Sequence, residues 1–578
     1  MNQNHNGTLT TAHVYRPMAT VFVLFITVTA LTVQADAPES PEEHFDLAVE
    51  LLKAEEPRDI DAAMEHLRAA AEKDHLKAQY ALGRLYLKRF DEKGEPQDGE
   101  QAFRWLKGAA ESGDSKAQEL FGHLYESGIA ASRDDAQALH WYRKSAEQGY
   151  DKAQLQLALM LHAGRGAPAD AAVAATWFEK AASQGHCCAQ AALGKLYADG
   201  DGVVQDDSTA ISWYRKAAAQ DDVAGLNYLG FMYGNGRGVP RDDAEAVRLF
   251  QQAADRDFAP AQYNLASYYF SGTGVERDIG KALSLFDNAA AQGYPEAEYM
   301  VAISYDSAEF GRPDPAQAID WYRKSAEHGH SPAQYALGFH YHSGVHTPLI
   351  DQDFVQALEW FGKAASKGYA DAQLDLGVMH LYGQGTEPDT ESGLAWIRKA
   401  ADQGLARAQL EMSALYFEGA HLSADPVEGI RWLKQAAEQD DPHAQLLLAT
   451  RLLNGDGVER DPSKAVPLLE AAAAQDSAEA QNWLAFLLFE GEAIPRDDAL
   501  AVRLLKRASA LGHGDAMESL GWAYETGRGV ATNEEEAIAW YTKAAENGSA
   551  RAAESLERLR KKNLSMTERF VEWLTAPE

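Results

Sequence analysis

The feature that most constrains this chain is an internal repeat with a period of 36 residues. Five tyrosines follow one another at this spacing, namely Tyr197, Tyr233, Tyr269, Tyr305 and Tyr341. The same sequence pattern surrounds each of them. Thirteen aligned blocks begin at Lys77, Lys116, Lys152, Cys188, Ala224, Pro260, Glu296, Pro332, Asp371, Arg407, His443, Glu479 and Asp515. A unit of this size cannot bury its own apolar faces, so the period predicts a stacked array in which neighbouring units build the core.

Each block is predicted to form two helices. In the block "CAQAALGKLYADGDGVVQDDSTAISWYRKAAAQDDV", a first helix is expected over about residues 189–199. Gly200 suits a left-handed position at the end of that helix, and Gly202 gives the turn a second permissive point. Asp206 or Asp207 is expected to cap the second helix, whose apolar residues recur at helical spacing. The chain is therefore predicted to be all-α.

Two block positions are explained by packing. The seventh is always glycine, alanine or serine, as expected where two helix backbones approach closely. The tenth is usually tyrosine, but leucine replaces it at Leu161, Leu452 and Leu488. Because leucine has no hydroxyl, this position is predicted to need volume rather than hydroxyl chemistry.

The stretch "MYGNGRGVPRDD", Met232 to Asp243, resembles a phosphate-binding loop because glycines surround two arginines. Gly236 and Gly238, however, occupy the turn positions that recur in other blocks. The stretch also joins helix to helix, whereas the nucleotide fingerprint follows a strand. We therefore expect an ordinary turn, although the repeat pattern does not explain Gly234.

The block pattern "AQxxLGxxYxxGxGVxxDxxxAxxWYxKAAxQG" resembles the Sel1-like repeat, a relative of the tetratricopeptide repeat, over about residues 77–550. The resemblance implies an α/α solenoid, a right-handed superhelix of helix pairs. It also implies a non-enzymatic scaffold, adaptor or regulator that binds partner proteins on its concave face. Many exported bacterial members of this family act at the cell envelope. Some cysteine-rich relatives are described as β-lactamases or penicillin-binding proteins, but this chain lacks their regularly spaced cysteine pairs. The alternative is a repeat-built hydrolase of that kind, or a protein that binds peptidoglycan or another glycan.

The segments that flank the array are predicted to be a signal and two caps. Arg16, the apolar run over residues 18–33 and the small residue Ala35 are typical of a secretory signal peptide over residues 1–35. We expect a periplasmic or secreted protein that touches a membrane only if this segment stays uncleaved. Residues 36–76 are predicted to be a capping helix pair. Residues 551–578 are predicted to be capping helices, with a capping box at Ser565 and Glu568.

Charge and motifs argue against several other functions. The formal net charge is −34, which disfavours nucleic acid as a partner. The patterns Ser-x-x-Lys, Gly-x-Ser-x-Gly and His-Glu-x-x-His do not occur in the sequence. We expect no enzymatic activity, no cofactor and no metal.

Two clusters of metal-ligating residue types leave alternatives open. Cys187 and Cys188 are the only cysteines, and they are interpreted as two small residues at a turn, with a redox or metal role for "HCC" as the alternative. The eighth block contains five histidines, at His328, His330, His340, His342 and His346. They are interpreted as solvated polar residues rather than metal ligands. His340 and His342 are two residues apart, so on a helix they point to different sides and cannot readily bind the same ion. Metal binding is the alternative there too.

A partner-binding face is predicted on the first helices of the units. At about 100° per residue, block positions 3, 6, 7 and 10 face the core, whereas positions 1, 5, 8 and 12 point away. Position 8 should favour polar residues, yet it holds four aromatic ones, and position 11 adds others. The candidate partner-binding residues are Phe231, Phe339, His340, His342, His346, Phe486, Phe489 and Trp522. The alternative is that a neighbouring unit covers these aromatic side chains.

Overall fold

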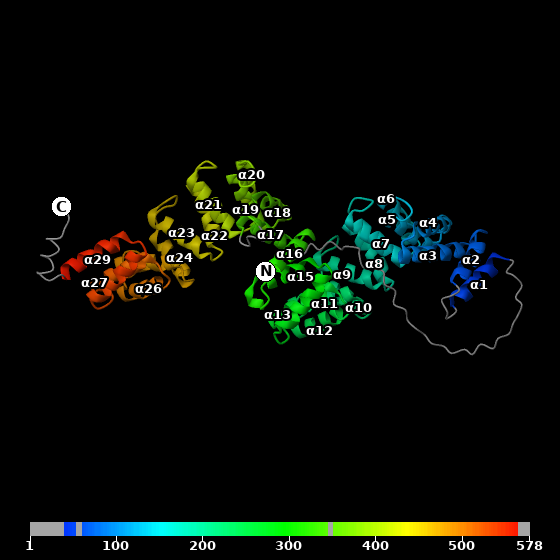
Figure 1. Cartoon of the computed structure of the whole chain (residues 1–578), viewed down its shortest axis with the longest axis horizontal. Helices are drawn as coiled ribbons and strands as arrows, with labels where there is room; N and C mark the ends of the chain where they lie inside the picture. Colours follow the sequence, from blue (N-terminus) through cyan, green and yellow to red (C-terminus); the bar gives the residue numbers. More distant parts are fainter. Residues whose placement is uncertain (1–39, 54–59, 345–350, 564–578) are drawn as a thin grey trace. The chain divides into compact units, whose positions relative to one another are not determined.

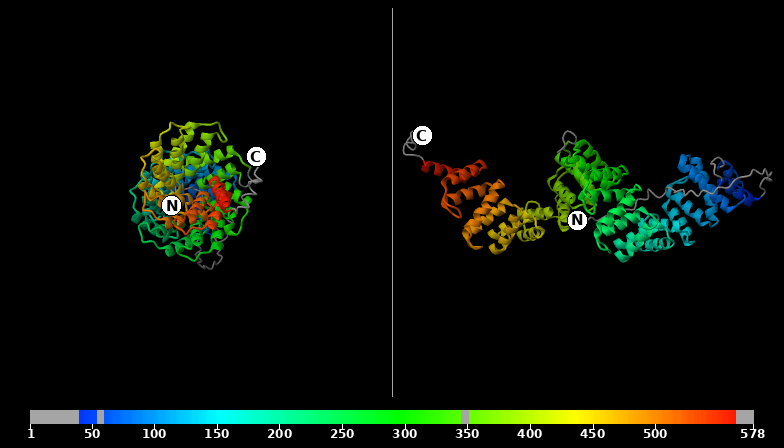
Figure 2. Two further views of the ribbon diagram at one scale, coloured as in Figure 1. Left: turned by 90° about the vertical axis from the view of Figure 1, so that its left-hand side faces the viewer. Right: turned by 90° about the horizontal axis from the view of Figure 1, so that it is seen from below.

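The computed structural model describes residues 40–53, 60–344 and 351–563. Apart from one short 3₁₀ turn, every regular element in these ranges is an α-helix. The chain divides into two compact units, residues 1–206 and 207–578. Figures 1 and 2 show the helices of each unit following one another in chain order, each packed against the next. The predicted all-α solenoid is confirmed. The signal segment, His346 and the capping box at Ser565 and Glu568 lie outside the described residues.

The helices of the first unit, in chain order, are α1 (Pro41–Lys53), α2 (Ile60–Ala71), α3 (Leu76–Lys93), α4 (Pro96–Glu111), α5 (Ser115–Ser127), α6 (Asp135–Glu147), α7 (Asp151–Ala163), α8 (Ala171–Ser183) and α9 (Cys187–Asp199). From α3 onward, odd numbers mark the first helix of a repeat and even numbers the second. The block at Lys77, which is three residues longer than most, also has a longer first helix, because α3 has 18 residues where α5 has 13.

The second unit begins with α10 (Asp207–Ala218), α11 (Val223–Asn235), α12 (Asp243–Ala254), α13 (Ala259–Ser271), α14 (Ile279–Ala291), α15 (Pro295–Asp306), the 3₁₀ turn η2 (Ala308–Phe310), α16 (Pro315–Glu327), α17 (Ser331–Ser343) and α18 (Phe354–Ser366). It continues with α19 (Ala370–Tyr382), α20 (Thr390–Asp402), α21 (Ala406–Glu418), α22 (Pro426–Ala437), α23 (Pro442–Asn454), α24 (Pro462–Ala474), α25 (Ala478–Glu490), α26 (Asp498–Ala510), α27 (Gly514–Thr526), α28 (Glu534–Glu546) and α29 (Ala550–Asn563).

Local sequence explains where these helices begin and end. Aspartates such as Asp170 and Asp242 cap second helices by accepting a hydrogen bond from the backbone N–H three residues later, at 2.9 and 3.0 Å. First helices end at a glycine in the left-handed region, for example Gly200 at φ 73°. Gly202 has φ 72°, so both predicted turn glycines have the expected conformation.

The glycine stretch at Met232–Asp243 is a packed turn. Gly236 and Gly238 are left-handed, and a Cβ atom on Gly238 would lie 2.8 Å from the side chain of Ile211. Gly234 lies inside α11, where a Cβ atom would collide with the hydroxyl of Tyr268 on α13. The repeat pattern did not explain Gly234, but the structure does: Tyr268 of the next repeat packs against it and leaves no room for a side chain.

The arginines of this stretch are held by carboxylates. Arg237 Nη2 lies 2.5 Å from Asp207 Oδ1, and Arg241 Nε lies 2.9 Å from Asp243 Oδ1. Both cations already have anionic partners within the protein. This pairing supports the interpretation of the stretch as a turn rather than a phosphate site.

Candidate functional site: an aromatic surface on α25 and α27

The aromatic residues at block position 8 lie on four first helices, α11, α17, α25 and α27. Their side chains are exposed to similar extents: Phe231 38%, Phe339 46%, Phe486 48% and Trp522 36%. Each follows directly after a buried small residue at position 7. The helical periodicity therefore predicted the outward direction of position 8 correctly, and the adjacent repeats leave these four side chains partly open to solvent.

Two of these four residues, Phe486 and Trp522, belong to successive repeats, and each packs against another aromatic ring. Phe486 on α25 packs edge-on against Trp483, with ring centroids 6.1 Å apart. Trp522 on α27 packs edge-on against Phe489, with ring centroids 5.4 Å apart. The helices α25 and α27 also contact each other directly. We call Phe486 and Trp522, with Phe489 packed against Trp522, the aromatic surface.

Arg528 fixes the α27 side of the aromatic surface. Its guanidinium carbon lies 5.1 Å from the ring centre of Phe489 and 5.3 Å from that of Trp522. Its Nη2 donates to the backbone oxygen of Phe489 at 2.5 Å and to Asp498 Oδ1 at 3.3 Å. Hydrogen bonds from Arg496 and Arg528 lower the pKa of Asp498 to about 2. The carboxylate is therefore ionised at neutral pH and holds Arg528 in place.

The structure corrects two of the predicted partner-binding residues. Phe489 is only 7% exposed, because position 11 lies beneath Trp522 and Arg528 of the next repeat. His340 is 6% exposed and lies against Tyr322, with ring centroids 5.3 Å apart. Both residues are part of the packing rather than of an exposed surface. A helical wheel of one unit misses this burial because the covering side chains come from other helices.

The remaining histidines of the eighth block are separated. His342 is half-buried, and its Nε2 lies 3.1 Å from Gln384 Oε1. His328 Nδ1 lies 2.8 Å from Glu298 Oε2. Within the described part of the chain, these histidines do not form a group of metal-ligating atoms.

A ladder of buried glutamines supports the first helices, and sequence reasoning missed it. The glutamine at block position 3 accepts a hydrogen bond from the glutamine thirty residues later, at the end of the second helix. These pairs are Gln118–Gln148, Gln154–Gln184, Gln262–Gln292, Gln373–Gln403, Gln409–Gln439 and Gln445–Gln475. Most of the inner glutamines also donate to a backbone carbonyl eight residues earlier, as Gln373 does to Ala365 at 3.1 Å. The pair of glutamines thirty residues apart that recurs in many of the blocks was the available signal.

Glu298 and His328 replace this glutamine pair in one repeat. Glu298 is buried, and its contact with His328 takes the place of the amide–amide hydrogen bond. Glu119 on α5 is a second buried carboxyl, next to the ladder residue Gln118. Burial raises the pKa of Glu119 to about 7, against the opposing charge of Lys152.

Among the helices of the described residues, none combines the length and the apolar content that crossing a membrane requires. Among curated proteins, no significant match to this chain was found.

Two of the solved structures to which this chain is similar are bacterial proteins. One is a protective antigen present in uropathogenic Escherichia coli strains and described as displaying an SLR fold; it is 29% identical, with a TM-score of 0.48, over 82% of this chain and 98% of that one. Another is a Sel1 repeat protein from Oxalobacter formigenes, 33% identical with a TM-score of 0.40, over 43% of this chain and 99% of that one.

The Sel1 repeat family model matches fourteen consecutive segments of the chain. They are residues 44–75, 76–114, 115–150, 151–186, 189–222, 223–258, 259–294, 295–330, 331–369, 370–405, 406–441, 442–477, 478–513 and 514–549. The first segment falls within residues 36–76, so the family model matches as a repeat the helix pair that the sequence pattern treated as a cap. With nearly the whole described array matched in this way, the chain belongs to the Sel1 repeat family.

Proposed function

We propose that this protein is a non-enzymatic scaffold that binds a partner protein through the aromatic surface on α25 and α27. Sel1 repeats generally mediate contacts between proteins. The observation that carries the site assignment is that Phe486 and Trp522, on successive first helices, stay partly exposed while their neighbours are packed. First helices line the concave side in the tetratricopeptide-type arrays that this chain resembles, and this supports the choice of face.

The aromatic surface has the properties of an interface hot spot. Trp522 is held by Phe489 and Arg528, so little conformational entropy is lost when a partner covers it. Tryptophan and arginine are enriched among residues whose truncation weakens binding by about 2 kcal/mol or more. The other two aromatic residues at block position 8, Phe231 and Phe339, lie on α11 and α17, which belong to repeats that are not adjacent to each other.

The charge of the chain indicates the chemistry of the partner. The formal net charge is −34, and the exposed Glu490 and Glu492 follow directly after the aromatic residues of α25. We therefore propose a protein segment that presents an aromatic or aliphatic side chain flanked by lysine or arginine. Such a segment gains both burial of apolar area and electrostatic attraction during encounter.

A displayed random-peptide library tests this proposal on the full chain. We expect the recovered peptides to combine an apolar residue with lysine or arginine. They should bind the double variant Phe486→Ala, Trp522→Ala at least about 30-fold more weakly, which corresponds to about 2 kcal/mol. The matched control is Phe231→Ala, Phe339→Ala, which removes aromatic residues of similar exposure at the same block position.

Equal loss in both double variants, or no loss in either, contradicts the site assignment. A chain that recovers no peptide but binds peptidoglycan fragments contradicts the proposed function itself.

We also propose that the protein is exported and acts at the cell envelope. The support is the sequence of residues 1–35, with Arg16, an apolar run and Ala35 before a polar stretch. Fractionation of the bacterium followed by mass spectrometry of the N-terminal peptide tests this. The expected product begins at Asp36 and is found outside the cytoplasm, whereas an intact N-terminus in the cytoplasm contradicts export.

A further inference from the structure

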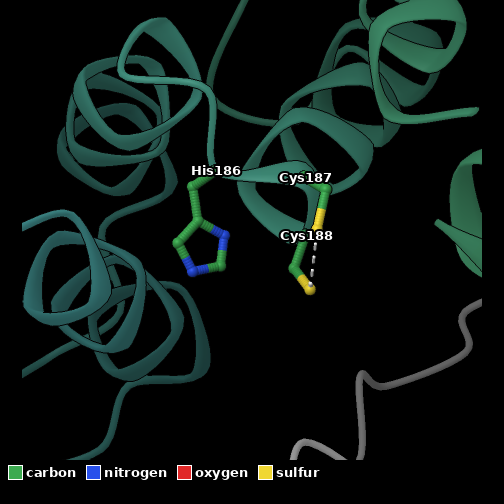
Figure 3. Close-up of side chains that lie close together, drawn as sticks. All are labelled: His186, Cys187 and Cys188. Carbon is green, nitrogen blue, oxygen red and sulfur yellow. Dashed lines mark hydrogen bonds between the residues drawn. The ribbon is translucent and has the colours of Figure 1, made fainter. Parts of the chain in front are cut away.

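His186, Cys187 and Cys188 form the one group of three or more metal-ligating side chains that the described residues bring together. His186 is the residue before α9, and the two cysteines open that helix. The three ligand atoms all lie within 4.8 Å of one another. Figure 3 shows the imidazole turned with one nitrogen toward the side on which both sulfur atoms lie. All three side chains are half-buried, so an ion has access from solvent.

The spacing of the sulfur atoms fits a shared metal ion. The two Sγ atoms are 3.9 Å apart, and no disulfide joins them. A metal ion about 2.3 Å from each sulfur, a usual metal–thiolate distance, would subtend an S–metal–S angle of about 116° at this 3.9 Å separation. That angle lies between the tetrahedral and trigonal values. The separation of the two sulfur atoms therefore already suits a shared ion.

We propose that His186, Cys187 and Cys188 bind one thiophilic metal ion, and that Cu⁺ is the ion that fits best. Two thiolates and an imidazole are a ligand set that selects soft ions. Binding displaces one proton from each thiol, so Cu⁺ with two thiolates forms a centre of net charge −1. The N-terminus of α9 stabilises a negative centre through its backbone dipole. Zn²⁺ bound by the same two thiolates and imidazole would form a neutral centre, which the dipole of α9 would stabilise less.

The site is independent of the aromatic surface, which lies on other repeats. Three protein ligands leave an ion accessible to a further ligand. Such a site captures a soft metal ion through its two thiolates.

Titration of the reduced full chain with Cu⁺ under nitrogen, against a chromophoric Cu⁺ chelator, tests the proposal. We expect one tightly bound ion per chain. Cys187→Ser and Cys188→Ser should each weaken binding at least about tenfold, because a direct ligand matters at least as much as an outer partner. X-ray absorption at the copper edge should show two sulfur ligands and one nitrogen ligand per ion.

Two further variants separate a three-ligand site from a simple pair of thiols. His186→Asn should weaken Cu⁺ binding and remove the nitrogen ligand from the absorption spectrum. The matched control His513→Asn alters a histidine at the same position before α27, where no cysteine is adjacent, and should change nothing. Circular dichroism checks that each variant is folded.

The proposal is overturned if the double variant Cys187→Ser, Cys188→Ser binds Cu⁺ as the natural chain does. It is also overturned if His186→Asn has no effect, or if Zn²⁺ displaces Cu⁺ from the reduced chain.

Discussion

Adjacent residues on the first helices face two different environments. Gly338 and Gly521, at block position 7, are buried so tightly that a Cβ atom would lie 2.6 Å from Phe361 and 2.8 Å from Tyr541, respectively. Phe339 and Trp522, one residue later, are partly exposed. Rotation by about 100° per residue thus moves a side chain from the packed side to the open side. The packed side explains the fold that every repeat shares, and the open side is where repeats differ and where binding is proposed.

The largest effect is expected from filling the packed side. Gly338→Leu forces a side chain into space that Phe361 already occupies, and we expect the repeat to lose about 3 kcal/mol of stability or more. Hydrogen exchange resolved to α17 and α18 measures this, because a repeat array need not unfold in one step. A loss below about 1 kcal/mol would mean that the two helices are not packed as described.

The buried carboxyl of Glu119 is expected to make the stability of the region around α5 depend on pH. Its folded pKa of about 7 lies above the ordinary value of 4.5, so the folded state holds the proton more tightly than the unfolded chain does. The stability of this region should therefore fall as the pH rises from about 4.5 to 7, by up to about 3 kcal/mol. Glu119→Gln should remove this slope and be the more stable protein at pH 8.

Hydrogen exchange of α5 at pH 5 and pH 8, corrected for the intrinsic exchange rate, checks this prediction. The variant Glu111→Gln, at an exposed position on α4, is the control and should keep the slope of the natural chain. If Glu119→Gln keeps that slope too, Glu119 is not the cause.

The glutamine ladder is expected to make a smaller contribution. Gln373→Leu removes the hydrogen bond to the backbone oxygen of Ala365 and the one from Gln403, and places an apolar side chain where Gln373 is buried. We expect a loss of about 1–2 kcal/mol. Gln403→Ala changes the exposed end of the same pair and should cost less, because water replaces the lost contact. Equal losses in local hydrogen exchange would show that burial of Gln373 does not matter.

The smallest effect on stability is expected on the open side. Phe339→Ala removes a partly exposed ring, so the expected loss is under about 1 kcal/mol. The same hydrogen-exchange measurement on α17, made beside Gly338→Leu, gives the direct comparison. A loss as large as that of Gly338→Leu would place Phe339 in the core.

The sequence predicted the features that each repeat determines by itself. Period, helix pairs, turn glycines and the direction of Phe486 follow from local pattern, and the structure confirms them. Contacts between repeats could not be predicted in this way. The burial of Phe489 depends on Trp522 and Arg528, and the glycine at Gly234 depends on Tyr268. The cluster at His186 was visible in the sequence, but only the structure shows that its three ligand atoms are close enough for one ion.

Photo-crosslinking in living cells tests the central claim most directly, with benzoyl-phenylalanine in place of Trp522 or, as the control, of Phe231. Both positions are block position 8 and are exposed to a similar extent. The account predicts a discrete protein adduct from position 522 that disappears when Phe486→Ala is added, and none from position 231. Adducts of equal yield from both positions, or an adduct at position 522 that Phe486→Ala leaves unchanged, would contradict it.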